Sequence, residues 1–106
     1  MTQNQKQVAA TILAQLGGNR FLAMTGAKSL MSLESGLQFS LPARFAANGI
    51  NRVRVMYHAG ADLYHVQFLK ISKRGLDVAI VAETEDCYAD MLAPVFTDAT
   101  GLDTRF

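Results

Sequence analysis

The chain has 106 residues, of which half are apolar and 18% are charged, and its formal net charge is +1. This composition excludes an intrinsically disordered chain, and no apolar run approaches the ~20 residues that cross a bilayer. The single cysteine excludes an internal disulfide framework, and the polar N-terminus is unlike a signal peptide. We therefore expect one compact domain over residues 1–106, soluble, cytoplasmic and without a membrane partner.

The charges divide unevenly along the chain. Nine of the ten basic residues precede Asp77, whereas seven of the nine acidic residues lie from Asp77 onward. Either the acidic C-terminal third covers and neutralises the basic part, or a basic patch stays free for a partner. The sequence leaves both alternatives open.

The N-terminal segment is predicted to be a helix over Gln3–Leu16. Its apolar residues form one stripe with the helical period, namely Val8, Ile12, Leu13 and Leu16. The pair Gly17–Gly18 ends the helix, because glycine readily takes the left-handed conformation at that point. Phe21–Thr25 is predicted to be a strand, broken by Gly26–Lys28.

Two short strands and one helical turn are expected next. The strands are predicted over Leu30–Leu33 and Leu37–Leu41. Their predicted pairs are Leu33 with Leu37 and Met31 with Phe39. Pro42 ends the second strand, because proline cannot donate to a sheet ladder. The helical turn is expected at Ala43–Ala47.

The segment Asn51–Glu83 predicts three consecutive antiparallel strands. From Arg52 to His58 and from Leu63 to Ile71, apolar and polar residues alternate with period two. With the turn at Gly60–Ala61, one register brings the apolar side chains to a single face. Its cross-strand pairs are Tyr57 with Tyr64, Val55 with Val66 and Val53 with Phe68.

The third of these strands follows a turn at Ser72–Gly75. A glycine bulge in that turn adds one residue and sets Phe68 opposite Ile80. The buried face then also includes Val78, Ile80 and Ala82. The opposite face carries Arg52, Arg54, Met56, His58, His65, Gln67, Val81 and Glu83, with His65 across from Glu83.

A C-terminal amphipathic helix is predicted between Asp86, as its N-cap, and Gly101, as its C-cap. Pro94 lies inside it, so either the helix kinks there, or a short turn ends near Leu92 and a second helix begins at Pro94. The predicted fold class is α+β, with an antiparallel sheet of five or six strands, an N-terminal helix and a C-terminal helix. At least one helix must pack on the buried face of the sheet.

Catalytic chemistry is weakly indicated. His58 and His65 are diagonal neighbours on one face and, with Glu83, resemble a sparse metal site or an acid–base pair. Surface or hydrogen-bonded histidines are the simpler interpretation, so we expect no metal site, no cofactor and no catalytic residue. Cys87 is expected to be unreactive, because neighbouring carboxylates raise the pKa of its thiol.

Basic residues give the strongest functional signal. Those that lie on or beside the predicted strands are Arg44, Arg52, Arg54, Lys70, Lys73 and Arg74. Such a cluster is typical of phosphate binding, which favours a nucleic-acid interface. A solvated or internally paired basic face is the alternative.

Several segments resemble a family of small proteins encoded by phages, prophages and plasmids. They are Asn19–Lys28, Asn48–Asn51, Asp62–Phe68, Tyr88–Asp90, Phe96–Thr97 and Thr100–Leu102. The resemblance implies a mobile-element accessory protein in the bacterial cytoplasm, and it comes with no activity that would assign a role to a residue. We expect a non-enzymatic protein that binds nucleic acid. The alternative is an interaction module that binds or inhibits a host protein. The oligomeric state is left open, with a homodimer among the alternatives.

Overall fold

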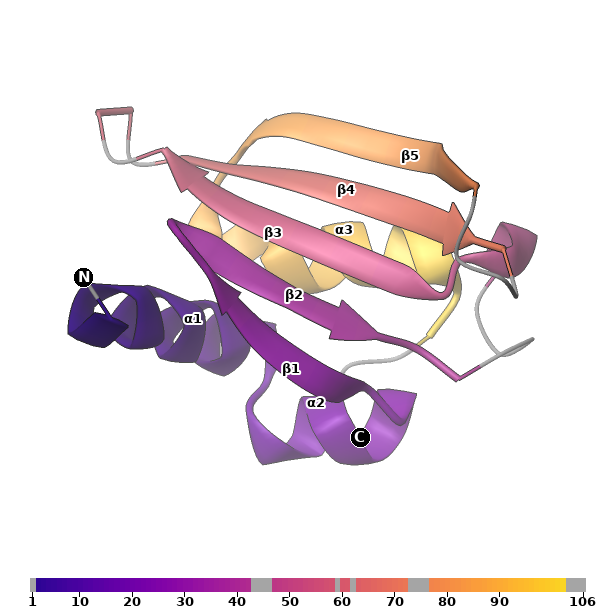
Figure 1. Ribbon diagram of the computed structural model, residues 1–106, viewed down its shortest axis with the longest axis horizontal. Helices are drawn as coiled ribbons and strands as arrows, with labels where there is room; N and C mark the ends of the chain where they lie inside the picture. The colour runs from indigo at the N-terminus through magenta and orange to yellow at the C-terminus, as the bar shows by residue number, and fades with distance from the viewer. Residues whose placement is uncertain (1, 43–46, 59, 62, 73–76, 103–106) are drawn as a thin grey trace.

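The computed structural model describes residues 2–42, 47–58, 60–61, 63–72 and 77–102. It has an α+β fold, in which five antiparallel strands form one sheet in the order β1-β2-β3-β4-β5. Helices α1 and α3 lie on the same side of the sheet (Figure 1). The helices are α1 (Thr2–Leu16), α2 (Asn19–Thr25) and α3 (Leu92–Thr100). The strands are β1 (Lys28–Leu33), β2 (Gly36–Ser40), β3 (Arg52–His58), β4 (Leu63–Ile71) and β5 (Val78–Cys87).

Helix α1 confirms the N-terminal prediction. Ile12 and Leu16 are fully buried against the sheet. The helix ends before Gly17 and Gly18, whose positive φ angles of 134° and 62° suit glycine. In the part of the chain that the structure describes, no helix is long and apolar enough to cross a membrane.

Helix α2 corrects the strand prediction for Phe21–Thr25. Phe21 and Thr25 are its buried residues, and their spacing of four places both on one helical face. The Thr25 hydroxyl donates to the Phe21 carbonyl at 2.7 Å and accepts from the Ala27 amide at 3.2 Å. A short apolar run does not distinguish a strand from a buried helix by periodicity, which is why the prediction was wrong.

The hairpin between β3 and β4 has the predicted register. Tyr57 pairs with Tyr64, Val55 with Val66 and Val53 with Phe68. Of these six side chains only Tyr57 is more than 6% exposed. This hairpin therefore confirms both the pairing and the face that it buries.

The edge strands pair differently from the prediction. On β1, Met31 pairs with Gln38 and Leu33 with Gly36, one residue away from the expected partners. All of β1 except Leu33 is exposed, so its apolar residues are not held by a core. Alternation on such a strand carries little information about its register.

Strand β5 also departs from the prediction, because its irregularities lie inside the strand. Phe68 pairs with Ala82, while Leu69 pairs with Ile80, so Val81 is an extra residue at a bulge. Val78 and Ile80 are each 56% exposed instead of buried. The turn expected to hold the bulge lies mostly outside the described residues, as does most of the expected helical turn at Ala43–Ala47.

Four phenylalanines join the helices to the sheet. The Phe21 ring makes edge-to-face contacts with Phe39 and Phe96 at centroid distances of 5.3 and 5.1 Å. Phe96 of α3 also contacts Phe68 of β4 at 6.4 Å. All four rings are at most 1% exposed, so they form the centre of the core.

The C-terminal region follows the second predicted alternative for Pro94. A 3-10 turn over Ala89–Met91 precedes α3, in which Pro94 lies in the first turn, where its missing amide costs no helical hydrogen bond. Gly101 ends α3 with a φ of 75°, as expected. Asp86 is not an N-cap, because it belongs to β5.

Candidate functional site

The candidate site is the face of the sheet turned away from the core, here called the open face. Alternation along the strands sends Phe39, Val55, Val66 and Cys87 into the core and their neighbours to the open face. One polar row crosses this face through successive cross-strand pairs. It consists of Gln38, Arg54, Gln67 and Glu83.

The basic part of the open face lies on β3. Arg54 Nε donates to Gln38 Oε1 at 2.7 Å, which fixes its guanidinium over β2. Arg52 Nε is shielded from solvent and has no hydrogen-bond partner among the described residues. These two arginines are the predicted cluster members that the structure brings together.

The remaining predicted basic residues are elsewhere or outside the described residues. Lys70 follows Leu69 on β4 and by alternation lies on the helix side, near Gly49 of the 3-10 turn Ala47–Gly49. Arg44, Lys73 and Arg74 fall outside the described residues. Among the described residues, the structure thus brings Arg52 and Arg54 together and places Lys70 apart from them, while the places of Arg44, Lys73 and Arg74 stay a prediction.

Lys28 is a basic residue that the sequence reading missed. It pairs with Ser40, which in turn pairs with Arg52, so the three residues lie in one row on the open face. The break predicted at Gly26–Lys28 includes Lys28, which is the first residue of β1 in the structure. Lys28 could have been identified from the sequence only if the first residue of β1 had been predicted correctly.

The acidic part of the open face lies on β5. Glu83 Oε2 is 3.0 Å from His65 Nε2 and accepts a hydrogen bond from Gln67 Nε2 at 2.8 Å. The His65–Glu83 contact is short, but it lacks the alignment of a hydrogen bond, and it is an ion pair only when the imidazole is protonated. Hydrogen bonding from Gln67 and the contact with His65 hold the pKa of Glu83 below its ordinary value.

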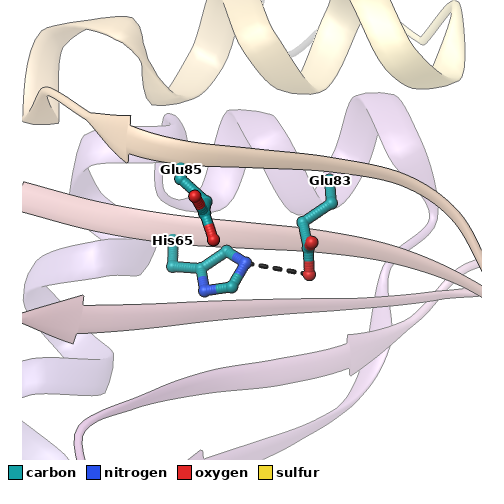
Figure 2. A group of neighbouring side chains, drawn as sticks. All are labelled: His65, Glu83 and Glu85. Carbon is teal, nitrogen blue, oxygen red and sulfur yellow. Dashed lines mark ion pairs between the residues drawn. The ribbon is translucent and has the colours of Figure 1, made fainter.

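The expected pairing of His65 with Glu83 is wrong in register but right in contact. Glu83 pairs with Gln67, and His65 reaches it diagonally (Figure 2). A second bulge sets His65 opposite both Glu85 and Asp86, the latter with a φ of 53°. Glu83 and Glu85, two residues apart, consequently point to the same side of β5 as His65.

His58 extends this cluster toward the end of the sheet. Its ring stacks on that of His65, with a centroid distance of 6.2 Å and an interplanar angle of 22°. A shallow hollow there is lined by His58, Ala61, His65, Glu85 and Asp86. The two histidines thus share a face, as predicted.

No family model, curated protein or solved structure matches the chain. The likeness to proteins of phages and plasmids stays a prediction, and the candidate site rests on geometry alone.

Cys87 lies on the core side of β5, and only 4% of it is exposed. It ends the strand instead of beginning a helix, and its thiol donates to the Tyr88 carbonyl at 3.5 Å. Burial raises the pKa of the Cys87 thiol, and the Asp90 carboxylate raises it further. Both effects disfavour the reactive thiolate.

We therefore expect Cys87 to react slowly in the native protein. With a disulfide reagent at neutral pH, labelling should be about an order of magnitude or more slower than in denaturant, where the thiol is exposed. The rate can be followed by absorbance under both conditions. Rapid stoichiometric labelling of the native chain would contradict the buried position and reopen a nucleophilic role.

Proposed function

We propose that this chain is a non-enzymatic binding protein, that its open face is the docking surface, and that a second copy of the chain is the partner. The observation that supports this is the division of charge on the face of the sheet turned away from the helices. Lys28, Arg52 and Arg54 lie on the β1–β3 side, and Glu83 and Glu85 lie on β5. A surface with one basic side and one acidic side favours a protein partner with the reverse arrangement of charges over a uniformly anionic partner.

The chain is its own electrostatic complement. A twofold axis running along β4, between two facing sheets, exchanges the positions of β3 and β5. Because Arg54, Gln67 and Glu83 form one cross-strand row, Arg54 of each copy then faces Glu83 of the other. Twofold interfaces are the commonest in soluble oligomers and are self-complementary in this way.

The size of the overlap sets the strength of the interface. With the axis along β4, strands β3, β4 and β5 of the two copies overlap. Three strands ~4.8 Å apart and about seven residues long at ~3.3 Å per residue give about 330 Å² per copy, or about 670 Å² in total. Stable specific interfaces generally bury more than about 1,000 Å², so the proposed dimer is a weak, transient one. Ile80 of β5 is 56% exposed within this overlap, and arginine is enriched in interfaces.

Charge reversal tests this proposal. Sedimentation of the full chain should show a dimer that Arg54→Glu weakens by at least about tenfold in Kd, equivalent to ~1.4 kcal/mol. Glu83→Arg should weaken it similarly. The double variant Arg54→Glu/Glu83→Arg should restore association, because both contacts are then reversed together. Glu34→Gln, at the exposed β1–β2 turn, serves as the control.

A monomeric wild type, or a double variant no better than the single ones, would overturn the proposal. Nucleic-acid binding is then the second candidate, favoured by the row of Lys28 and Arg52. The two functions differ in their response to Glu83→Arg, which should weaken a dimer but strengthen binding to a labelled DNA. DNA binding should also fall by a decade or more between ~50 and ~200 mM salt.

A further inference from the structure

Three side chains with metal-binding donor atoms converge on the open face, beside β5. They are His65, Glu83 and Glu85, whose ligand atoms all lie within 4.8 Å of one another (Figure 2). We propose that they form a binding site for a divalent transition metal of the Zn²⁺ type. This site does not require the proposed dimer, although Glu83 belongs to both.

The distances are close to those of a coordinated ion. Bonds of ~2.0–2.1 Å to a tetrahedral metal place neighbouring ligand atoms about 3.3 Å apart. His65 Nε2 and Glu83 Oε2 are already 3.0 Å apart. Glu85 is exposed, and a rotation of its flexible side chain can close the remaining gap.

The backbone of β5 explains why these three residues meet. Glu83 and Glu85 are two positions apart, so both project from the open face. The bulge opposite His65 places Glu85 beside the imidazole. Figure 2 shows both glutamate side chains extending from β5 toward the His65 ring.

The hydrogen bonds of the cluster leave a metal-binding atom of the histidine without a hydrogen-bond partner among the described residues. His65 Nε2 is shielded from solvent, and it has no aligned hydrogen bond in the described part of the chain. Gln67 donates to Glu83 Oε2, which orients this carboxylate as outer hydrogen bonds orient metal ligands. The same hydrogen bond lowers the pKa of Glu83 and keeps it in the anionic form that binds a cation.

The donor set selects the class of metal. An imidazole nitrogen with carboxylates suits Zn²⁺ and neighbouring transition metals, whereas Mg²⁺ and Ca²⁺ prefer oxygen ligands only. Three protein ligands leave the fourth position to water. The adjacent hollow, lined by His58 and Asp86, gives water access to that position.

Calorimetric titration with Zn²⁺ of the full chain, free of any affinity tag, tests the site. We expect one Zn²⁺ per chain and no heat of binding with Mg²⁺. His65→Ala and Glu85→Gln should each weaken Zn²⁺ binding at least tenfold, while Glu34→Gln should leave it unchanged. Thermal melts without metal establish that the variants are folded. Co²⁺ absorption should change on binding to wild type but not to His65→Ala.

The result also separates this site from the proposed dimer. Arg54→Glu, which weakens the proposed dimer, should bind Zn²⁺ at least as tightly as wild type, since Arg54 lies two strands from Glu83 of its own chain and the Arg54 of a second copy no longer competes for that carboxylate. The absence of Zn²⁺ binding by the folded wild type would overturn the proposal. So would a folded His65→Ala variant with unchanged affinity, or binding that depends on His58 but not on His65.

Discussion

Val66→Asp is expected to abolish the folded state. Val66 is 2% exposed and lies between Val55 of β3 and Thr84 of β5, on the core side of the central sheet. A carboxylate at this position would lose its hydration without gaining a partner, a cost of several kcal/mol. Because domains of this size are stable by only about 5–15 kcal/mol, we expect most or all of that stability to be lost.

Val78→Asp provides a matched control for this prediction. The same change is made on β5, where Val78 is 56% exposed and an aspartate stays hydrated. Circular dichroism melts should show a cooperative transition within a few degrees of wild type for Val78→Asp and none for Val66→Asp. A cooperative melt of Val66→Asp close to that of wild type would mean that Val66 does not face the core.

The β3–β4 hairpin was predictable because one face of each strand is buried. Tyr57, Val55 and Val53 must meet apolar partners, and a slip of one residue would place Arg54 in the core. When one face of each strand is buried, the alternation of apolar and polar residues therefore determines which residues pair.

On the edge strands β1 and β5 the same reasoning failed, because several of their apolar residues are exposed and burial does not determine the register. Leu30 and Met31 on β1 are exposed at 42% and 55%, and Ile80 on β5 is exposed too. An apolar residue on an edge strand therefore gives no information about which face is buried. The two bulges of β5 depend on long-range pairing, and they have no local sequence signal.

The candidate site shows the same division between burial and exposure. That Arg54, His58 and His65 share the open face followed from the well-constrained hairpin. Glu85 was missed because it joins His65 only through a bulge. Lys28 was missed because its strand was predicted to begin later. A site whose residues meet across an irregular edge strand can be identified only from the structure.

Gly36→Ala is expected to destabilise the protein strongly, although the change adds one methyl group. Gly36 is the first residue of β2, is buried, and pairs with Met56 of β3. A Cβ atom at this position would overlap the carbonyl oxygen of Val55 and lie 3.0 Å from Met56 Cα. Both neighbours are backbone atoms, so no side-chain rotation can relieve the contact. Glycine within a strand often marks such a close approach of two backbones.

Relief of that overlap requires β2 to move away from β3. The movement would strain the pairing of Leu37 with Val55 and the hydrogen bond of 2.7 Å from the Tyr57 amide to the Ser35 carbonyl. Overpacking costs about 1–3 kcal/mol, and each kcal/mol lowers the Tm of a domain of this size by roughly 4–8 °C. Gly60→Ala is the matched control, because a Cβ atom there meets nothing within 4 Å. We expect Gly36→Ala to melt at least several degrees below Gly60→Ala, and equal melting temperatures would show that β2 and β3 are not so closely apposed.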